Sequence, residues 1–189
     1  ALGAVDFLMW VVTGISTGLT QGFSIQLSQY YGAKDFENLR KSLAHSYRLT
    51  AFIAAGVLIL SQSFASLVLT GLHTPSNIIG MSLLYLRIIF CGIPATAAYN
   101  MFASALRAMG NSKTPLTAMI IASVLNVSLD ILFVAGFGWG VAGAAIATVI
   151  AQSFSAVYCF LILRRIDIVH LSRADFMSAA GMNARLMKL

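Results

Sequence analysis

The chain has 189 residues, of which 59% are hydrophobic and 10% are charged, and its mean hydropathy is +0.86. A soluble domain of this length cannot carry so much apolar surface, so the composition excludes an ordinary soluble enzyme. The formal net charge of +6 would suggest a nucleic-acid partner on a soluble protein, and its meaning here depends on where the basic residues lie.

Apolar runs in chain order predict five membrane helices. No charged residue occurs between residues 7 and 33, which is long enough to span a bilayer with some tilt. The charged stretch 34–48 is predicted to be a connector, and the glycine and proline of 71–75 end the second helix. The tail, 165–189, is predicted to be an amphipathic segment at the membrane surface. The helices are expected at about 5–30, 50–70, 77–109, 115–135 and 141–163.

The basic residues alternate between the predicted connectors. The first connector holds four Lys or Arg residues, the second none, the third two, the fourth none and the tail five, which leaves Arg87 inside a helix. The positive-inside rule therefore places the first and third connectors and the tail in the cytoplasm and residue 1 outside. The basic surplus is an orientation signal, so nucleic acid is not expected as a partner. An outside N-terminus predicts at least one further helix upstream.

A polar layer is predicted inside the membrane around Asp130, because a carboxylate at membrane depth costs about 2.5 to 3.5 kcal/mol unless it is paired or hydrated. Asn126 precedes it by four residues and lies on the same helical face. The short glycine connector centred on Trp139 makes the flanking helices antiparallel neighbours. Residues equidistant from Trp139 then share a depth, which pairs Asp130 with Thr148 and, separately, Asn126 with Gln152. Hydrogen bonding between helices is the alternative use of these residues.

Other candidate residues carry weaker signals. Tyr85 could reach the same layer, although a lone tyrosine is more often an interfacial anchor. Arg87 is expected to snorkel to the outer interface. The three histidines have no second ligand at metal spacing, and no catalytic triad, carboxylate pair or phosphate-binding loop occurs. We therefore expect a protein that is not an enzyme.

Several segments, in order, carry a resemblance to a known family. They are LRAMGNSKTP at 106–115, NVSLD at 126–130 and GWGVAGAAIAT at 138–148, together with QYYGAKD at 29–35 and YLRI at 85–88. Over essentially the whole chain the sequence resembles the multidrug and toxic compound extrusion (MATE) family.

The resemblance implies an all-α membrane fold of two six-helix bundles related by a pseudo-two-fold axis. Residues 1–164 would supply helices two to six of the first bundle, and 165–189 a cytoplasmic linker toward a missing second bundle. The implied function is a cation-coupled antiporter that exports organic, often cationic, compounds by alternating access. The fragment alone is expected to be inactive, because alternating access needs both bundles.

The resemblance also implies an ion site and no cofactor beyond the coupling ion, Na⁺ or H⁺. The matching positions are Asp130, Asn126 and Thr148, with Ala144 contributing its backbone and Tyr85 nearby, and Gln152 lies in the same layer. The family site usually includes an acidic residue on the first helix, which this chain lacks. An oxygen cluster suits Na⁺ and a carboxyl in an apolar layer suits H⁺, so the sequence leaves the ion open.

Two other functions stay open at this stage. A lipid-linked oligosaccharide flippase of the same superfamily shares the bundle architecture but tends to have a more basic cavity, for which Arg87 is the single candidate. A non-transporting membrane subunit would pair with a partner or with itself. In each case we expect a multi-pass protein of the plasma or bacterial inner membrane that contacts lipid, and an antiporter adds an organic cation as partner.

Overall fold

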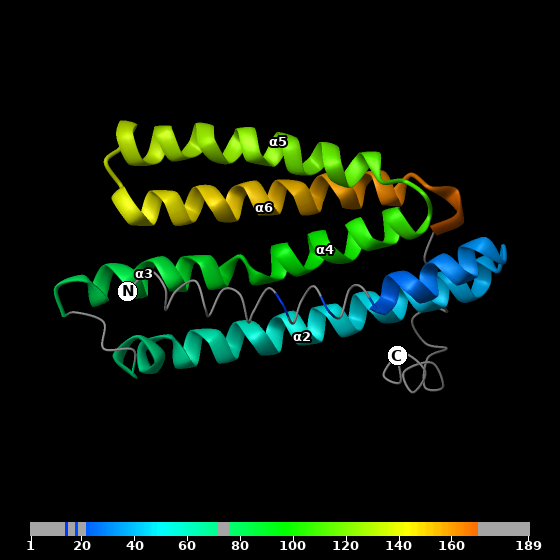
Figure 1. The fold of residues 1–189 in the computed structure, drawn as a ribbon, viewed down its shortest axis with the longest axis horizontal. Coiled ribbons are helices and arrows are strands. Elements are labelled where there is room, and N and C mark those ends of the chain that lie inside the picture. Colours follow the sequence, from blue (N-terminus) through cyan, green and yellow to red (C-terminus); the bar gives the residue numbers. More distant parts are fainter. Residues whose placement is uncertain (1–13, 15–17, 19–21, 72–75, 170–189) are drawn as a thin grey trace.

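The computed structural model describes residues 14, 18, 22–71 and 76–169, and every regular element in these ranges is a helix (Figure 1). A helical segment at 22–32 precedes the labelled helices. The labelled elements are α2 (Phe36–Gly71), α3 (Ser76–Cys91), α4 (Ile93–Ala108), α5 (Lys113–Asp130), the π-helix η1 (Ile131–Gly136), α6 (Gly140–Arg164) and the short 3₁₀ helix η2 (Asp167–Val169).

Among the residues that the structure describes, four stretches are long and apolar enough to cross a membrane, and they are Phe36–Gly71, Ile78–Ala108, Lys113–Gly136 and Gly140–Arg164. The predicted all-α membrane fold is therefore confirmed. The first predicted span, 5–30, lies largely outside the described residues, as does most of the predicted amphipathic segment 165–189.

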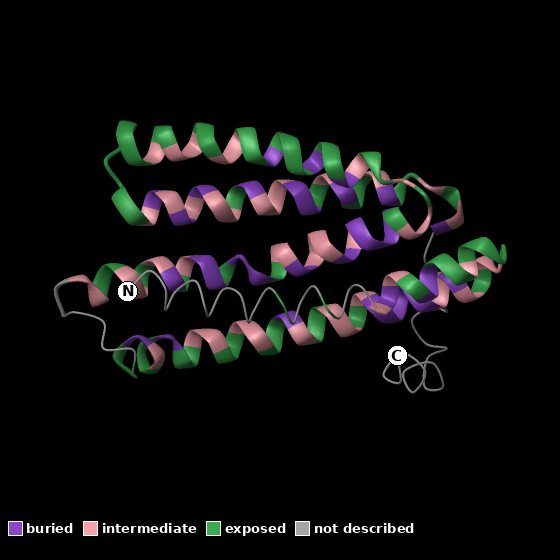
Figure 2. Ribbon diagram, in the orientation of Figure 1, coloured by how far each residue is buried: buried purple, intermediate pink, exposed green. Residues whose placement is uncertain are grey.

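The helices lie side by side along one long direction (Figure 1). Helix α6 packs against α3, α4 and α5, whereas α2 packs against α3 and α4. Helix α6 is also the most buried span, and α5 the least (Figure 2). The apolar faces that stay exposed are those that a membrane would cover.

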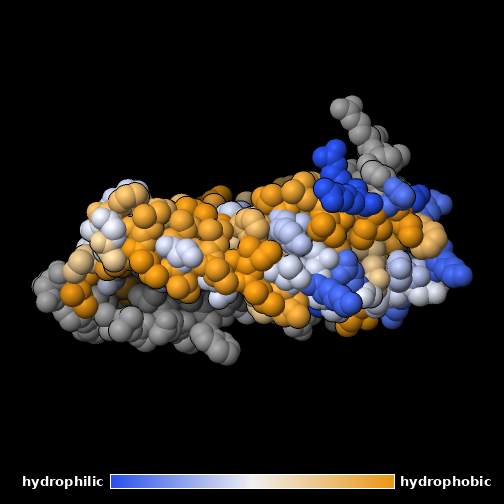
Figure 3. All heavy atoms as spheres, turned by 90° about the horizontal axis from the view of Figure 1, so that it is seen from above, coloured by the Kyte–Doolittle hydropathy of each residue, from blue (hydrophilic) through white to orange (hydrophobic). Residues whose placement is uncertain are grey.

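The strongly hydrophilic residues gather at one end of the bundle (Figure 3). At this end α2 and α5 begin and α4 and α6 finish, and we call it the basic end because its described Lys and Arg residues are Lys34, Arg40, Lys41, Arg48, Arg107, Lys113, Arg164 and Arg165. Arg87 is the exception. It is exposed on α3, eleven residues after Ser76, or about 16 Å along the helix. Its snorkelling stays a prediction.

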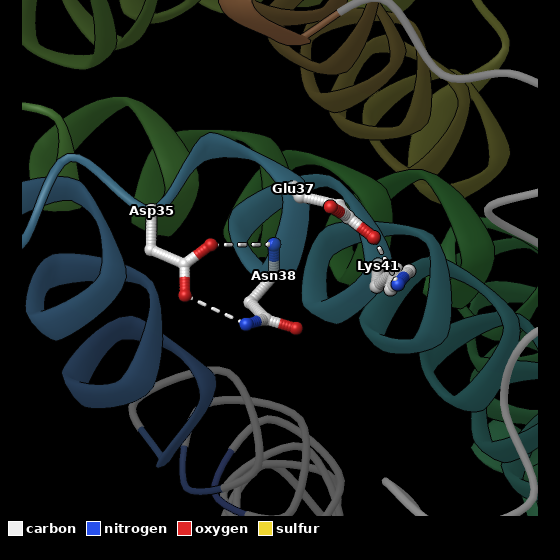
Figure 4. A network of polar contacts seen from close by, with 4 residues as sticks. All are labelled: Asp35, Glu37, Asn38 and Lys41. Carbon is white, nitrogen blue, oxygen red and sulfur yellow. Dashed lines mark hydrogen bonds and ion pairs between the residues drawn. The ribbon is translucent and has the colours of Figure 1, made fainter.

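The charged stretch predicted as a connector is mostly helical. Helix α2 begins at Phe36, rather than near residue 50, and Asp35 explains why (Figure 4). Its carboxylate accepts hydrogen bonds from the backbone N–H of Asn38, at 3.2 Å, and from Asn38 Nδ2, at 2.6 Å. Both bonds hold the pKa of the Asp35 carboxyl below its usual value, and the bond from the Asn38 side chain has the larger effect. The first turn is thus capped outside the membrane.

The first turns of α2 have one polar face and one buried face. Lys41 Nζ lies 2.5 Å from Glu37 Oε1 on the solvent side (Figure 4). Leu39 and Leu43 are buried on the other side, together with the polar residues 42, 45 and 46. The charges therefore mark one face of a helix rather than a gap between helices, because four-residue spacing keeps them on that face.

The predicted helix 77–109 is interrupted at Gly92, which separates α3 from α4. Pro94 lies in the first turn of α4, where its missing N–H costs least. The Gly92 N–H donates to the Ile89 carbonyl at 2.8 Å. A Cβ at Gly92 would lie 2.9 Å from Val149 Cγ2, so the absence of a side chain lets the break lie against α6.

The predicted helix 115–135 is regular only to Asp130, and η1 follows it. Its wide turn closes on an aromatic cluster, in which the ring centroids of Phe133 and Trp139 lie 5.1 Å apart and those of Phe137 and Trp139 lie 5.4 Å apart. The Trp139 N–H donates to the Phe133 carbonyl at 2.9 Å. Gly138, with φ of +69°, makes the turn into α6, a conformation that other residues rarely adopt.

Candidate functional site

A polar link joins α5 and α6 inside the apolar bundle. Asn126 Nδ2 donates to Thr148 Oγ1 at 3.4 Å, and the Thr148 hydroxyl donates to the Ala144 carbonyl at 3.0 Å. All three residues are half-buried. The link therefore brings three predicted site residues together within two turns of neighbouring helices.

The depth pairing differs from the one predicted around Trp139. Thr148 meets Asn126 rather than Asp130, and Gln152 meets a residue of α4 instead of Asn126. The symmetry argument assumes a regular α-helix up to the connector. The π-helix η1 has more residues in each turn, so the chain advances less per residue and Asn126 comes closer to the connector.

Asp130 is the last residue of α5, one turn beyond Asn126. Its Oδ1 atom is buried and has no hydrogen-bond partner among the residues that the structure describes. The Ser128 hydroxyl, two residues earlier in the helix, donates to the Val124 carbonyl at 2.8 Å. A buried carboxylate oxygen without a partner is costly, so this atom is suited to a bound cation or a proton.

A second polar link joins α4 to α6. Thr96 Oγ1 lies 2.6 Å from Gln152 Oε1 and 3.2 Å from the Gly92 carbonyl. Gln152 Oε1 would also lie 3.3 Å from a Cβ placed on Gly92. The amide of Gln152 is thus held against the break between α3 and α4.

The two links border one cavity of about 350 Å³ between α4, α5 and α6. Its lining is rich in hydroxyl and amide groups and carries no charged side chain, and it consists of Thr96, Tyr99, Asn100, Met119, Ala122, Ser123, Asn126, Thr148, Ala151, Gln152 and Ser155. Asp130 is not in the lining but lies one turn from it through Asn126.

Sequence reasoning missed the α4 contribution to this cavity. Thr96, Tyr99 and Asn100 are spaced by three and four residues, so they form one polar stripe on an apolar helix. The Tyr99 hydroxyl donates to the Pro115 carbonyl at 3.3 Å. Counting uncharged polar residues by helical face would have found the stripe.

Tyr85 lies at the level of the polar link on α6. Helices α3 and α6 run in the same direction (Figure 1), and Gly92 lies against Val149 and Gln152. Seven residues earlier, Tyr85 is therefore level with about residues 142–145, which include Ala144. It is half-buried.

The donor set points to a hard ion. In the described part of the chain, no group of three or more His, Cys, Asp and Glu residues could hold a metal. The polar link offers amide, hydroxyl and carbonyl oxygens, and the Asp130 carboxylate lies one helical turn away; oxygen donors of this kind suit an alkali cation or a proton rather than a transition metal.

Comparison with known proteins gives one consistent family. A sequence model of the family described as MatE matches residues 1–132. The chain is similar to the probable multidrug resistance protein YoeA of Bacillus subtilis, 32% identical over 160 residues that cover 82% of the chain and 34% of the relative. It is similar to YpnP of the same organism, 33% identical over 161 residues that cover 84% and 36%. The chain thus spans about a third of the length of these relatives.

Solved structures show the same fold at lower identity. An inward-facing MATE family transporter of the MOP superfamily matches 98% of the chain and 43% of its own, with a TM-score of 0.89 and 22% identity. An outward-facing one matches all of the chain and 43% of its own, with a TM-score of 0.88 and 23% identity.

Proposed function

The chain belongs to the MatE family, and from this premise we propose that it forms part of the ion-binding bundle of a cation-coupled antiporter that exports organic, often cationic, compounds by alternating access. Residues 1–164 are then a partial first bundle, and 165–189 lead toward a second bundle. Because the chain spans about a third of its relatives, the proposed activity is that of the complete gene product, which lies in the plasma or bacterial inner membrane with the basic end in the cytoplasm.

The observation that carries this proposal is the buried Oδ1 atom of Asp130, which has no hydrogen-bond partner among the described residues. A carboxylate at membrane depth is expensive, and residues of this kind usually mark ion or proton pathways. A bound cation or proton would remove that cost. We therefore infer that Asp130 carries the coupling ion.

The neighbouring oxygens fit either form of coupling. For Na⁺, the carboxylate of Asp130 would be joined by Asn126, by the Thr148 hydroxyl and by the Ala144 carbonyl, with Tyr85 at the same level. For H⁺, Asp130 alone would hold the proton at its carboxylate. The Asn126 to Thr148 hydrogen bond, at 3.4 Å, is long enough to rearrange at little cost when the charge on Asp130 changes.

The cavity supports an organic cation as substrate. Its hydroxyl and amide groups can accept hydrogen bonds, and Tyr99 and Met119 offer polarisable surface to a cation. Its lining includes no Lys or Arg, so it does not favour the flippase alternative, which needs contacts to an anionic phosphate.

Coupling between ion binding and substrate binding would follow from the residues that the two sites share. Asn126 and Thr148 line the cavity, and they also lie within a turn of Asp130 or Ala144. A change of charge on Asp130 therefore alters the hydrogen bonding of groups that would touch the substrate. Ion and substrate can then compete for the same side chains, which is the minimum that an antiporter requires.

The decisive test is Asp130→Asn in the complete gene product. We expect ion-driven efflux of ethidium, an organic cation, to be lost while the amount of protein in the membrane stays normal. Glu37→Gln, which changes an exposed carboxyl at the basic end in a surface pair with Lys41, is the control and should export at the wild-type rate. Unchanged efflux by the Asp130 variant would overturn the proposal.

The same pair of variants separates the two coupling ions. Saturable ²²Na⁺ binding between pH 5 and 8 that is lost in Asp130→Asn would assign Na⁺. Proton release on ethidium binding, with no ²²Na⁺ binding at any pH, would assign H⁺.

A further inference from the structure

An apolar groove lies on the other side of α4 from the polar cavity. It has a volume of about 390 Å³, and it runs between α2 and α4 as far as the ring of Phe160 on α6. Small residues form much of its lining, among them Ala54, Ala55 and Ala98. None of the residues proposed for ion or substrate binding lines it.

A second groove adjoins the first. It has a volume of about 450 Å³, lies between α4 and α6, and shares Pro94, Ala98, Phe102 and Phe160 with its neighbour. The rings of Phe102 and Phe160 lie 5.3 Å apart. These shared rings form a ridge between the two apolar grooves, which lie side by side.

The first groove becomes polar toward the basic end. Tyr47 and Thr50 line it there, and Thr50 Oγ1 is buried with no hydrogen-bond partner in the described ranges. Farther along α2 the lining is Ala51, Ala54 and Leu58. The groove is therefore lined by hydroxyl-bearing residues at one end and by hydrocarbon along the rest.

Positive charge stands at the same end of both grooves. Arg48 precedes Ala51 by three residues and Ala55 by seven, so it continues the stripe of α2 that lines the first groove. Arg164 follows Phe160 by four residues, so it continues the stripe of α6 that lines the second groove. Both arginines are exposed.

We propose that these paired grooves bind one anionic phospholipid, with an acyl chain on each side of the Phe102–Phe160 ridge and the phosphate between Arg48 and Arg164. The ester oxygens of such a lipid lie between phosphate and acyl chains, and along the groove this is the level of Thr50, between Arg48 and the apolar lining. A fatty acid would fill only one groove. A membrane helix, about 10 Å across, would have to displace the ridge.

The test uses the complete gene product, freed of lipid in detergent and incubated with dioleoyl phosphatidylglycerol or dioleoyl phosphatidylcholine. Native mass spectrometry counts the lipids retained. We expect one phosphatidylglycerol to be retained in preference to phosphatidylcholine. The double variant Arg48→Gln, Arg164→Gln should weaken the binding of phosphatidylglycerol about 30-fold, since each basic residue near a membrane surface contributes about fivefold.

Filling the grooves with a larger side chain tests whether the acyl chains bind there. Ala98→Phe, at the junction of both grooves, should remove binding of both lipids, and Ala55→Phe on the rim serves if the first variant does not fold. Two controls should bind like the wild type. They are Arg165→Gln with Lys113→Gln, which removes exposed charges at the same end, and Ala135→Phe on η1.

Three results would overturn the proposal: equal retention of both lipids with no effect of the arginine variants, unchanged binding after the groove is filled, or no lipid retained by the folded wild type. The last would mean that another part of the protein occupies the grooves. None of these results bears on Asp130, because the export and ²²Na⁺ assays measure different residues.

Discussion

The two sides of α4 hold cavities of similar volume and opposite chemistry. Toward α5 and α6 lies the polar cavity of about 350 Å³, bordered by Thr96 and Asn100, whereas toward α2 lies the apolar groove of about 390 Å³, bordered by Ala98 and Phe102. The alternation along a few turns of one helix is enough to separate them. Position on the helical face, rather than overall hydropathy, therefore decides which space can hold a polar ligand.

The comparison extends to hydrogen bonding. Thr96 on the polar side lies 2.6 Å from Gln152 Oε1. Thr50 on the apolar side is buried without a partner in the described part of the chain. One threonine hydroxyl is therefore hydrogen-bonded and the other is not, so substitutions at the two positions should change stability in opposite directions.

The largest effect is expected at Gly92, where the break between α3 and α4 lies against α6. A Cβ there would lie 2.9 Å from Val149 Cγ2 and 3.0 Å from the Ile89 carbonyl oxygen, which is backbone and cannot give way. Gly92→Val should force α4 away from α6 and destabilise the protein by about 1 to 3 kcal/mol. Thermal unfolding in detergent measures it.

Gly56→Ala is the matched control for that variant. No heavy atom lies within 4 Å of its added Cβ, and the residue is inside α2. Alanine in a helix interior should raise stability by about 0.5 to 1 kcal/mol. Equal losses at both glycines would show that close packing at Gly92 is not the cause.

The next effect is expected at Thr96. Thr96→Val removes the donor that Gln152 Oε1 uses, and bonds between membrane helices of this kind contribute about 0.6 to 1.7 kcal/mol. The double variant with Gln152→Met should lose less than the sum of the single variants, because it leaves no polar group without a partner. Strict additivity in this double-mutant cycle would contradict the hydrogen bond.

A smaller effect is expected at Ser155, which is buried beside the polar cavity. Its hydroxyl donates to the carbonyls of Ala118 and Ala151 at 3.4 Å and 3.3 Å, both long. Ser155→Ala should therefore cost about 0.5 kcal/mol or less, measured by the same unfolding assay. A loss as large as that of Thr96→Val would mean that the hydroxyl has a stronger role.

An effect of the opposite sign is expected at Thr50. In lipid-free detergent, Thr50→Val replaces a buried hydroxyl without a partner by a methyl group of similar size. Stability should stay the same or rise by up to about 1 kcal/mol. A loss equal to that at Thr96 would erase the contrast between the two sides of α4.

In the sequence, the lone carboxylate of α5 was a strong indication of a functional site, whereas the uncharged polar residues were weak indications. Asp130 stands out because a charge in an apolar run is rare and expensive. Thr96 and Asn100 did not stand out, since hydroxyl and amide groups are tolerated in membrane helices as packing contacts. Their function in the structure depends on α5 and α6, which are far away in sequence.

Charge density also led to a wrong prediction at the start of α2. The stretch 34–48 carries enough charge to suggest a connector, yet its apolar residues have helical spacing and Asp35 caps the first turn. Reading the face of the helix instead of the charge density would have predicted the longer helix. No such reading predicts the π-helix after Asp130, because its wide turn is supported by contacts among Phe133, Phe137 and Trp139.

By itself the sequence determined that this is an all-helical, multi-pass membrane protein of the MatE family, because hydropathy and local motifs are properties of single segments. It also predicted that Asp130 needs compensation, since a carboxylate at membrane depth is costly unless it is paired or hydrated. Only the tertiary structure decided which residues meet. The pairing of Asn126 with Thr148, the break at Gly92 and the two cavities flanking α4 depend on how far each helix advances along its neighbour, and one irregular turn is enough to change that register.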